Sequence, residues 1–233
     1  MSQHPISRAL ISVLAGVLAC LPALAGAAED KQDFSAAERL LFMTDQLRNV
    51  HPPTALRYSF QKSGSFETGF KDTVNVQLTR RPDGRCCSVK GEFLSGERRV
   101  TMPELEQADG NPVTLYFLEH DIREMQRLTK GSQTHFRKQI RLAVYQAVTV
   151  REVTLVYRGK SVHGQQVTIS PYLDDPNRPR FEKFASKVYQ FSFSDEVPGG
   201  VYGIRSQIAG EAPDAPALLV EEMLLDGAEP APR

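Results

Sequence analysis

Histidine and carboxylate side chains that could bind a metal or transfer protons gather between residues 111 and 146 of this 233-residue sequence. His120 and Glu124 are four residues apart, so on a helix they share a face and could supply two metal ligands. His135 follows in the same segment. However, the mixed charges of Glu119-His-Asp-Ile-Arg-Glu124 are typical of a solvated helix surface. The sequence therefore predicts no metal site and no cofactor, and a hydrolase or metalloenzyme with its site near these residues is the alternative function.

Serine nucleophiles and phosphate-binding glycines have no recognisable motif. The sequence contains no Gly-x-Ser-x-Gly elbow, which would present a serine at a sharp turn between strand and helix. Pro198-Gly199-Gly200 precedes a predicted strand and not a helix, so no helix dipole would face an anion there. The sequence predicts no catalytic residue.

Cys86 and Cys87 are the only cysteines beyond Cys20. Adjacent residues of a strand point to opposite faces, which favours one buried and one exposed free thiol. A strained vicinal disulfide, formed in an oxidising compartment, is the alternative.

Two sets of side chains are candidates for binding. Aromatic residues that alternate with polar ones on predicted strands are Tyr58, Phe60, Tyr189, Phe191 and Phe193. Core packing is the default explanation of such a face, and lining an apolar pocket is the functional one. Basic residues on the exposed face of a predicted helix are Arg137, Lys138 and Arg141. They could contact an anionic partner, but the formal net charge of +0 favours ordinary solvation and gives no reason to expect nucleic acid.

The apolar periodicity predicts the elements that position these residues. A capping box at Ser35-Ala-Ala-Glu38 begins a helix that we expect to end at Asn49. Two further helices are predicted at about 111–130, with Leu115 in its buried stripe, and about 132–146. Period-two alternation predicts strands at about 56–61, 74–79, 86–94, 98–102, 153–157, 167–169, 189–193, 202–208 and 218–225.

The strands follow one another through short turns, which favours antiparallel pairing. The predicted fold class is α+β: a mainly antiparallel, strongly curved sheet or partial β-barrel, with an N-terminal helix and two central helices packed against it. This single globular domain is expected to cover residues 28–226, and composition predicts a disordered tail at 227–233.

The N-terminal segment is typical of a secretory signal peptide. Arg8 precedes an apolar run from Ala9 to Leu24, and small residues fit a cleavage site after Ala25 or Ala27. Residues 1–27 are therefore predicted to be a cleaved signal, with no membrane span after cleavage. Lipidation of Cys20 and retention at a membrane is the alternative to a soluble periplasmic protein.

The order of elements in this exported chain is similar in outline to that of the periplasmic lipoprotein carriers. The similarity is one of architecture, and no motif or functional residue is carried over from it. We expect a non-catalytic periplasmic binding or carrier protein for an apolar small molecule, a lipid or an envelope protein partner.

Overall fold

The computed structural model describes residues 34–84, 86–147, 149–212 and 214–232, which belong to one compact unit. The predicted signal peptide at 1–27, with Cys20, lies outside the described residues, as do residues 28–33. None of the helices within the described ranges has both the length and the apolar character needed to span a membrane.

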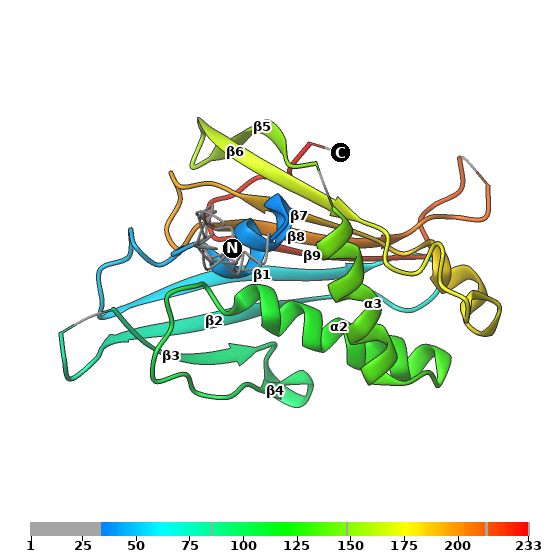
Figure 1. Cartoon of the computed structure of the whole chain (residues 1–233), viewed down its shortest axis with the longest axis horizontal. Coiled ribbons are helices and arrows are strands. Elements are labelled where there is room, and N and C mark those ends of the chain that lie inside the picture. Colours follow the sequence, from blue (N-terminus) through cyan, green and yellow to red (C-terminus); the bar gives the residue numbers. More distant parts are fainter. Residues whose placement is uncertain (1–33, 85, 148, 213, 233) are drawn as a thin grey trace, which may run out of the picture. The chain divides into compact units, whose positions relative to one another are not determined.

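All strands join one antiparallel nine-stranded sheet of order β4-β3-β2-β1-β9-β8-β7-β6-β5 (Figure 1). The strands are β1 Thr54–Ser63, β2 Phe70–Arg80, β3 Cys86–Phe93, β4 Val100–Thr101, β5 Arg151–Tyr157, β6 Lys160–Ile169, β7 Val188–Phe193, β8 Val201–Ile208 and β9 Leu219–Leu225. Hairpin turns connect most neighbours, while β1 and β9 pair in the middle and join the two halves. The predicted α+β class and antiparallel sheet are confirmed. The predicted fourth strand at 98–102 is shorter, because residues Gly96–Arg98 form a 3-10 turn.

The N-terminal helix is shorter than predicted. The capping box of Ser35 and Glu38 is confirmed and begins α1, Ala36–Glu38, which continues as a π-helical turn, Arg39–Met43. The chain then becomes extended at Thr44. The Gln46 side chain donates to the Leu40 carbonyl over 2.9 Å and replaces the main-chain bond of a longer helix. The prediction of a helix up to Asn49 is therefore wrong beyond Met43.

The two central helices are α2, Val113–Thr129, and α3, Gln133–Gln146. The α2 side chains that point directly at the sheet recur every four residues and are fully buried: Val113, Phe117, Asp121 and Met125. Leu115 lies on another side of the helix and is 51% exposed, so its predicted place in the buried stripe is wrong. The buried stripe instead includes a carboxylate, Asp121.

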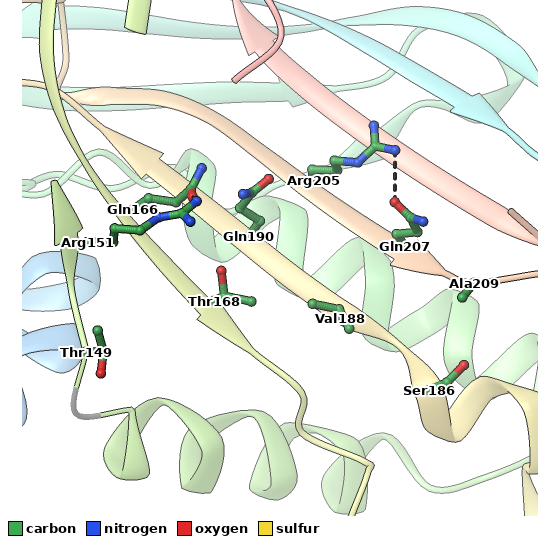
Figure 2. Close-up of a pocket in the computed structure, with 10 residues that line it drawn as sticks. All are labelled: Thr149, Arg151, Gln166, Thr168, Ser186, Val188, Gln190, Arg205, Gln207 and Ala209. Carbon is green, nitrogen blue, oxygen red and sulfur yellow. Dashed lines mark hydrogen bonds between the residues drawn. The ribbon is translucent and has the colours of Figure 1, made fainter. Parts of the chain in front are cut away.

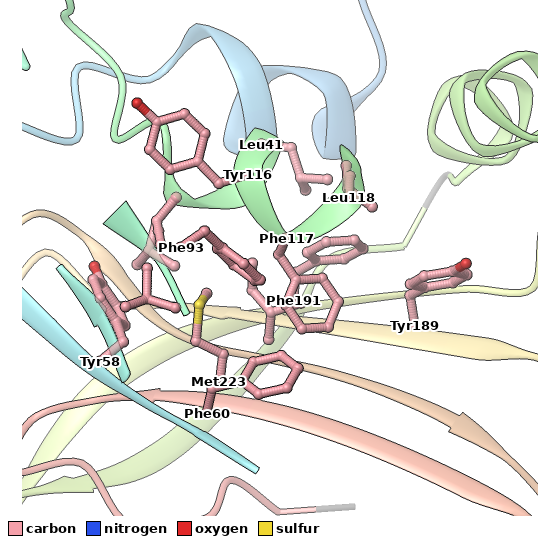
Figure 3. Close-up of a cluster of buried hydrophobic side chains, with 14 of the residues drawn as sticks. Leu41, Tyr58, Phe60, Phe93, Tyr116, Phe117, Leu118, Tyr189, Phe191 and Met223 are labelled. Atoms are coloured by element: carbon pink, nitrogen blue, oxygen red, sulfur yellow. The ribbon is translucent and has the colours of Figure 1, made fainter. Parts of the chain in front are cut away.

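Apolar side chains from the helices and from one face of the sheet form the core. Figure 3 shows Phe60, Phe117, Phe191 and Met223 gathered there. Cys87 is also buried in this core, and the structure joins it to Cys86 in a vicinal disulfide, the alternative to the two free thiols favoured by the sequence.

The half of the sheet from β5 to β9 is strongly curved. Strands β8, β7 and β6 separate β9 from β5, so a flat sheet would hold them about 19 Å apart. Yet Ala228, just beyond the end of β9, forms a bridge with Tyr157 at the end of β5. The steps from Leu225 to Ala228 can span only about 11 Å, and the bridge adds about 5 Å, which is still less than the separation in a flat sheet. These five strands therefore curl into a trough, and the sheet remains open because β4 and β5 do not pair within the described ranges.

The trough opens on the side of the sheet away from the helices. Asp121 of α2 bonds to Tyr189 of β7, whereas the neighbouring Gln190 points to the other face. Residues 226–232, here called the tail, lie along the trough (Figure 1, red). Composition predicted disorder from residue 227, but the tail has defined partners: Glu229 donates its amide hydrogen to the Val156 carbonyl over 3.1 Å.

Candidate functional site

The five predicted aromatic ligand-binding residues all lie in the interior. Tyr58 and Phe60 are 1% exposed, Tyr189 and Phe191 are 0% exposed, and Phe193 is 4% exposed. Phe60 packs on the ring of Phe93 at 5.7 Å, and Tyr189 stacks on Phe191 at 6.4 Å. Their surroundings are those of core residues, and their role in binding an apolar ligand stays a prediction.

The predicted anionic-partner residues lie on α3. Arg137 forms a two-pronged ion pair with Glu119 of α2, at 2.7 and 2.8 Å. Lys138 and Arg141 are exposed. Arg137 is therefore partly neutralised, which leaves two free cations for any contact at this surface.

The histidines considered for catalysis or metal binding are not brought together. His120 faces Glu221, with Nε2 3.6 Å from Oε1, whereas His135 contacts Asp175 at 2.5 Å. Glu124 binds the Lys62 ammonium at 3.0 Å instead of a metal-ligand partner. Within the described residues no group of three or more His, Cys, Asp or Glu side chains could hold a metal ion.

A buried charge cluster lies between α2 and the sheet, and consists of His120, Asp121, Lys62, Lys187 and Glu221. The Lys187 ammonium contacts Asp121 Oδ1 and lies 3.8 Å from Glu221. Tyr189 donates its hydroxyl to Asp121 Oδ2 over 2.5 Å. Glu221 is 0% exposed and, among the described residues, neither of its carboxylate oxygens has a hydrogen-bond partner, so the neighbouring cations must compensate its charge.

Burial and neighbouring charges act against each other on the two acids of this cluster. Burial would raise the pKa of Glu221, but the His120 ring and the ammonium groups of Lys187 and Lys62 lower the pKa to about 2. Burial raises the pKa of Asp121; Glu221 adds to the increase, while Lys187 opposes it. Because Asp121, Lys187 and Glu221 are fully buried and His120 and Lys62 nearly so, the cluster acts inside the fold, and a ligand must be sought elsewhere.

The trough contains an open concave site. It is a groove of about 500 Å³, lined by Thr149, Arg151, Gln166, Thr168, Ser186, Val188, Gln190, Arg205, Gln207 and Ala209. Adjacent strands β6, β7 and β8 supply most of these side chains at alternate positions. Six of these ten residues carry an amide or a hydroxyl group and none is acidic, while Val188, Ala209 and the aliphatic parts of the side chains supply apolar surface.

The two arginines of the groove have partners of different charge. Arg205 pairs with Glu222 at 3.0 Å and donates to Gln207 at 3.0 Å (Figure 2, dashed line). Arg151 donates to the neutral side chain of Gln166, and no carboxylate of the described chain pairs with it. The groove therefore carries a positive charge that an anionic group of a ligand could meet.

One end of the groove already binds a main-chain carbonyl. Gln166 and Gln190 both donate their amide hydrogens to the carbonyl of Pro232 in the tail, over 3.2 and 3.1 Å. Gln166 is 2% exposed, and its amide is further fixed by Ser192 at 3.3 Å. These amides form a built carbonyl-binding site on the trough floor.

Neither the groove nor the charge cluster was predicted from the sequence. A signal for the groove exists in the polar positions between the aromatic ones, since Gln190, Arg205 and Gln207 alternate with buried residues. A signal for the cluster exists in strand β9, where period-two alternation must turn one of Glu221 and Glu222 inward.

Comparison with known proteins shows distant structural likeness. No protein-family model and no curated protein matches the sequence. Among solved structures, the lipoprotein LppX of Mycobacterium tuberculosis aligns with a TM-score of 0.33 and 8% identity, over 80% of this chain and 92% of that chain. At this TM-score the likeness supports no argument about function, so the chemistry of the site rests on its own residues.

Proposed function

We propose that this chain is an exported, non-catalytic binding protein that holds a polar, extended and anionic ligand in the trough groove. The observation that carries the proposal is the set of polar groups in the lining: amides, hydroxyls and two arginines, with no acidic residue, beside the apolar Val188 and Ala209. Such groups are hydrogen-bond donors and acceptors that fix a ligand without reacting with it.

Binding is favoured over catalysis by the chemistry of this lining. A hydrolytic site needs a nucleophile or base with a partner that activates it. Arginine and glutamine supply neither, and the Ser186 hydroxyl donates to the Lys183 carbonyl over 2.9 Å. The histidines of the alternative proposal contact Glu221 and Asp175 away from the groove.

Export is part of the proposal and rests on the sequence of residues 1–27. Deletion of this segment should keep the protein in the cytoplasm, as measured by cell fractionation. Replacement of Cys20 by serine should leave the protein soluble in the periplasm, as expected for conventional cleavage. Release from the membrane only after this substitution would show the lipid-anchored alternative instead.

An apolar small molecule or lipid remains a second candidate ligand, on the basis of the aromatic strands. It would have to separate α2 from the sheet, because Phe117 and Phe191 are 0% exposed and fill this space. Native mass spectrometry after incubation with envelope lipids tests this candidate, and a retained lipid mass would support it over the groove.

Nuclear magnetic resonance of the isotope-labelled full chain tests the groove directly. Three classes of compound are added in turn: an acidic peptide, an acidic oligosaccharide and a fatty acid. We expect the peptide or the oligosaccharide to shift the side-chain amide signals of Gln190 and Gln207, because these groups line the groove. The proposal fails if neither compound moves these signals.

A matched pair of variants separates the groove from the helical surface. Arg151→Gln should weaken binding of the active compound, because it removes the groove cation that no carboxylate of the described residues neutralises. Arg141→Gln removes an exposed charge on α3 and should leave binding unchanged. If Arg141→Gln weakened binding and Arg151→Gln did not, the anionic contact would lie on α3, where the sequence offered it.

A further inference from the structure

The tail of this chain follows a path that a ligand could continue. It begins at the free edge of β5, where the main-chain amide of Arg158 donates to the Gly227 carbonyl over 2.7 Å. The Ala228 bridge to Tyr157 is antiparallel. The tail then leaves this edge and ends, in the described structure, at Pro232 over the amides of Gln166 and Gln190.

The prolines of the tail are compatible with its register at the strand edge. The amides of Arg158 and Glu229 make the hydrogen bonds that flank the bridge between Ala228 and Tyr157. A longer strand would next use the amide of Ala231, so the nitrogens of Pro230 and Pro232 face away from β5 in this register. A tail carbonyl that is not paired with a strand needs another donor. The two glutamine amides supply it for Pro232, so the trough recognises an extended main chain through side-chain donors.

The groove continues in the direction of the tail with a spacing suited to polypeptide. Gln166 and Thr168 of β6 lie two residues apart on one face, as do Arg205 and Gln207 of β8. Side chains two residues apart in a strand are separated by about 6.6 Å. The carbonyls on one side of an extended peptide repeat at this same distance, so successive carbonyls could meet successive rows of donors.

The charge of the groove adds a requirement on the ligand. Arg151 bonds to the neutral Gln166, which already holds the tail carbonyl. An acidic side chain of the ligand next to this point would pair with Arg151 and form a charge-assisted hydrogen bond.

We infer that the ligand of the groove is an extended, proline-tolerant peptide segment with an acidic side chain, bound in line with the chain's own tail. The inference rests on the proposed function, since it names the chemical class that this groove takes. The partner is therefore another protein with an exposed extended segment.

The test measures peptide affinity for the full-length protein by fluorescence anisotropy. The peptides are blocked at both ends and alternate alanine and proline, with a single glutamate placed at each position in turn. Matched peptides carry glutamine at the same position. We expect one glutamate position to bind about tenfold more tightly than its glutamine match, the typical contribution of a charge-assisted pair.

Variants assign this preference to the groove. Arg151→Gln should remove the tenfold difference, while Arg141→Gln should leave it intact. Unchanged far-ultraviolet circular dichroism and melting temperature would show that both variants fold. The inference is overturned if glutamate gives no preference, or if Arg141→Gln removes the preference instead.

The outcomes separate this inference from the proposed function. If no peptide binds but an acidic oligosaccharide shifts the groove amides, the groove binds ligands and only the peptide class is wrong. If neither compound acts on the groove, both proposals fail. Weaker binding of every peptide to Gln190→Ala would support capture of main-chain carbonyls, since this variant removes a donor that acts on any sequence.

Discussion

Strands β6, β7 and β8 have two faces that are closed by different means. On the helix side, Phe191 and Tyr189 of β7 are 0% exposed beneath α2 and α3. On the trough side of the same strand, Gln190 lies in an open groove and is partly covered by the tail. One face is therefore closed by a packed layer of helices, and the other is only partly covered, by a short segment held mainly through hydrogen bonds.

The two faces also treat polar groups differently. The helix side encloses full charges, with Lys187, Asp121 and Glu221 all 0% exposed. The trough side uses neutral amides: that of Gln166 donates a hydrogen to the Pro232 carbonyl of the tail and accepts one from Arg151. Buried charges are stable only as a complete set, whereas amides can exchange one partner for another. The helix side is thus suited to fixing the fold, and the trough side to exchanging ligands.

Variants at two neighbouring residues of β7 should show the largest difference in the free energy of unfolding between the two faces. Phe191→Ala should lower the free energy of unfolding by about 3–5 kcal/mol, because it opens a cavity in the core. Gln190→Ala should change it by no more than about 1 kcal/mol, the value of a typical hydrogen bond. Denaturant unfolding of both variants measures this. A small effect of Phe191→Ala on stability with a large effect on lipid binding would instead show an apolar pocket.

Loss of the buried cation should have an effect of similar size. Lys187→Met leaves Asp121 and Glu221 without their nearest positive charge and should destabilise the fold by about 3–5 kcal/mol. Adding Asp121→Asn should recover part of this, with a coupling energy of about 0.5–3 kcal/mol. A double-mutant cycle by denaturant unfolding measures both values.

The exposed pair of Arg137 and Glu119 is the control for that cycle. Its side chains are 42% and 36% exposed, so Arg137→Met should change stability by only about 0.2–1 kcal/mol. If Lys187→Met and Arg137→Met lowered the free energy of unfolding by the same amount, a special role of the buried cluster would be contradicted.

The sequence predicted the strand-rich architecture well because period-two alternation reports which face of a strand is buried. Tyr189, Phe191 and Phe193 were placed correctly on one face. The same alternation could not show that helices cover this face completely, because the volume between layers depends on tertiary packing. It therefore left a solid and a hollow interior equally open.

The groove and the cluster depend on contacts that no local pattern contains. Asp121 and Lys187 come from segments far apart in the chain, and Glu221 joins them only because β9 lies beside β8. The trough could not be predicted without the bridge between Ala228 of the tail and Tyr157 of β5. The helix predicted up to Asn49 failed for a related reason, since the bond of Gln46 to the Leu40 carbonyl is a side-chain contact that competes with the helix.

Acid should weaken the helix side through Glu221. Its pKa in the fold is about 2, below the value of about 4.3 for an unfolded glutamate. Its stabilisation is therefore present above about pH 4.3 and is lost as the pH falls toward 2. The lowered pKa values of Glu124 and Glu67 act in the same direction, while the raised pKa of Asp121 opposes it.

Glu221→Gln isolates this contribution. The stability difference between wild type and variant should be largest at pH 7 and shrink as the pH falls from 5 to 2. Unfolding by urea at several pH values measures the difference. A constant difference over this range would mean that Glu221 does not titrate as the cluster geometry requires.

The trough side should respond least in stability but most in local order. Tyr202 donates its hydroxyl hydrogen to the carbonyl of Val156 or Glu229, each 2.6 Å away, and accepts from the Glu229 amide at 2.9 Å. Tyr202→Phe should therefore lower the free energy of unfolding by only about 0.5–1.5 kcal/mol. Because the same hydroxyl fixes the tail, amide hydrogen exchange at Glu229 should become much faster, while exchange in β7 stays unchanged. Tyr145→Phe, at a 61% exposed position on α3, is the matched control and should alter neither. If exchange in β7 rose together with that at Glu229, the tail would be part of the core, and the two faces would not be independent.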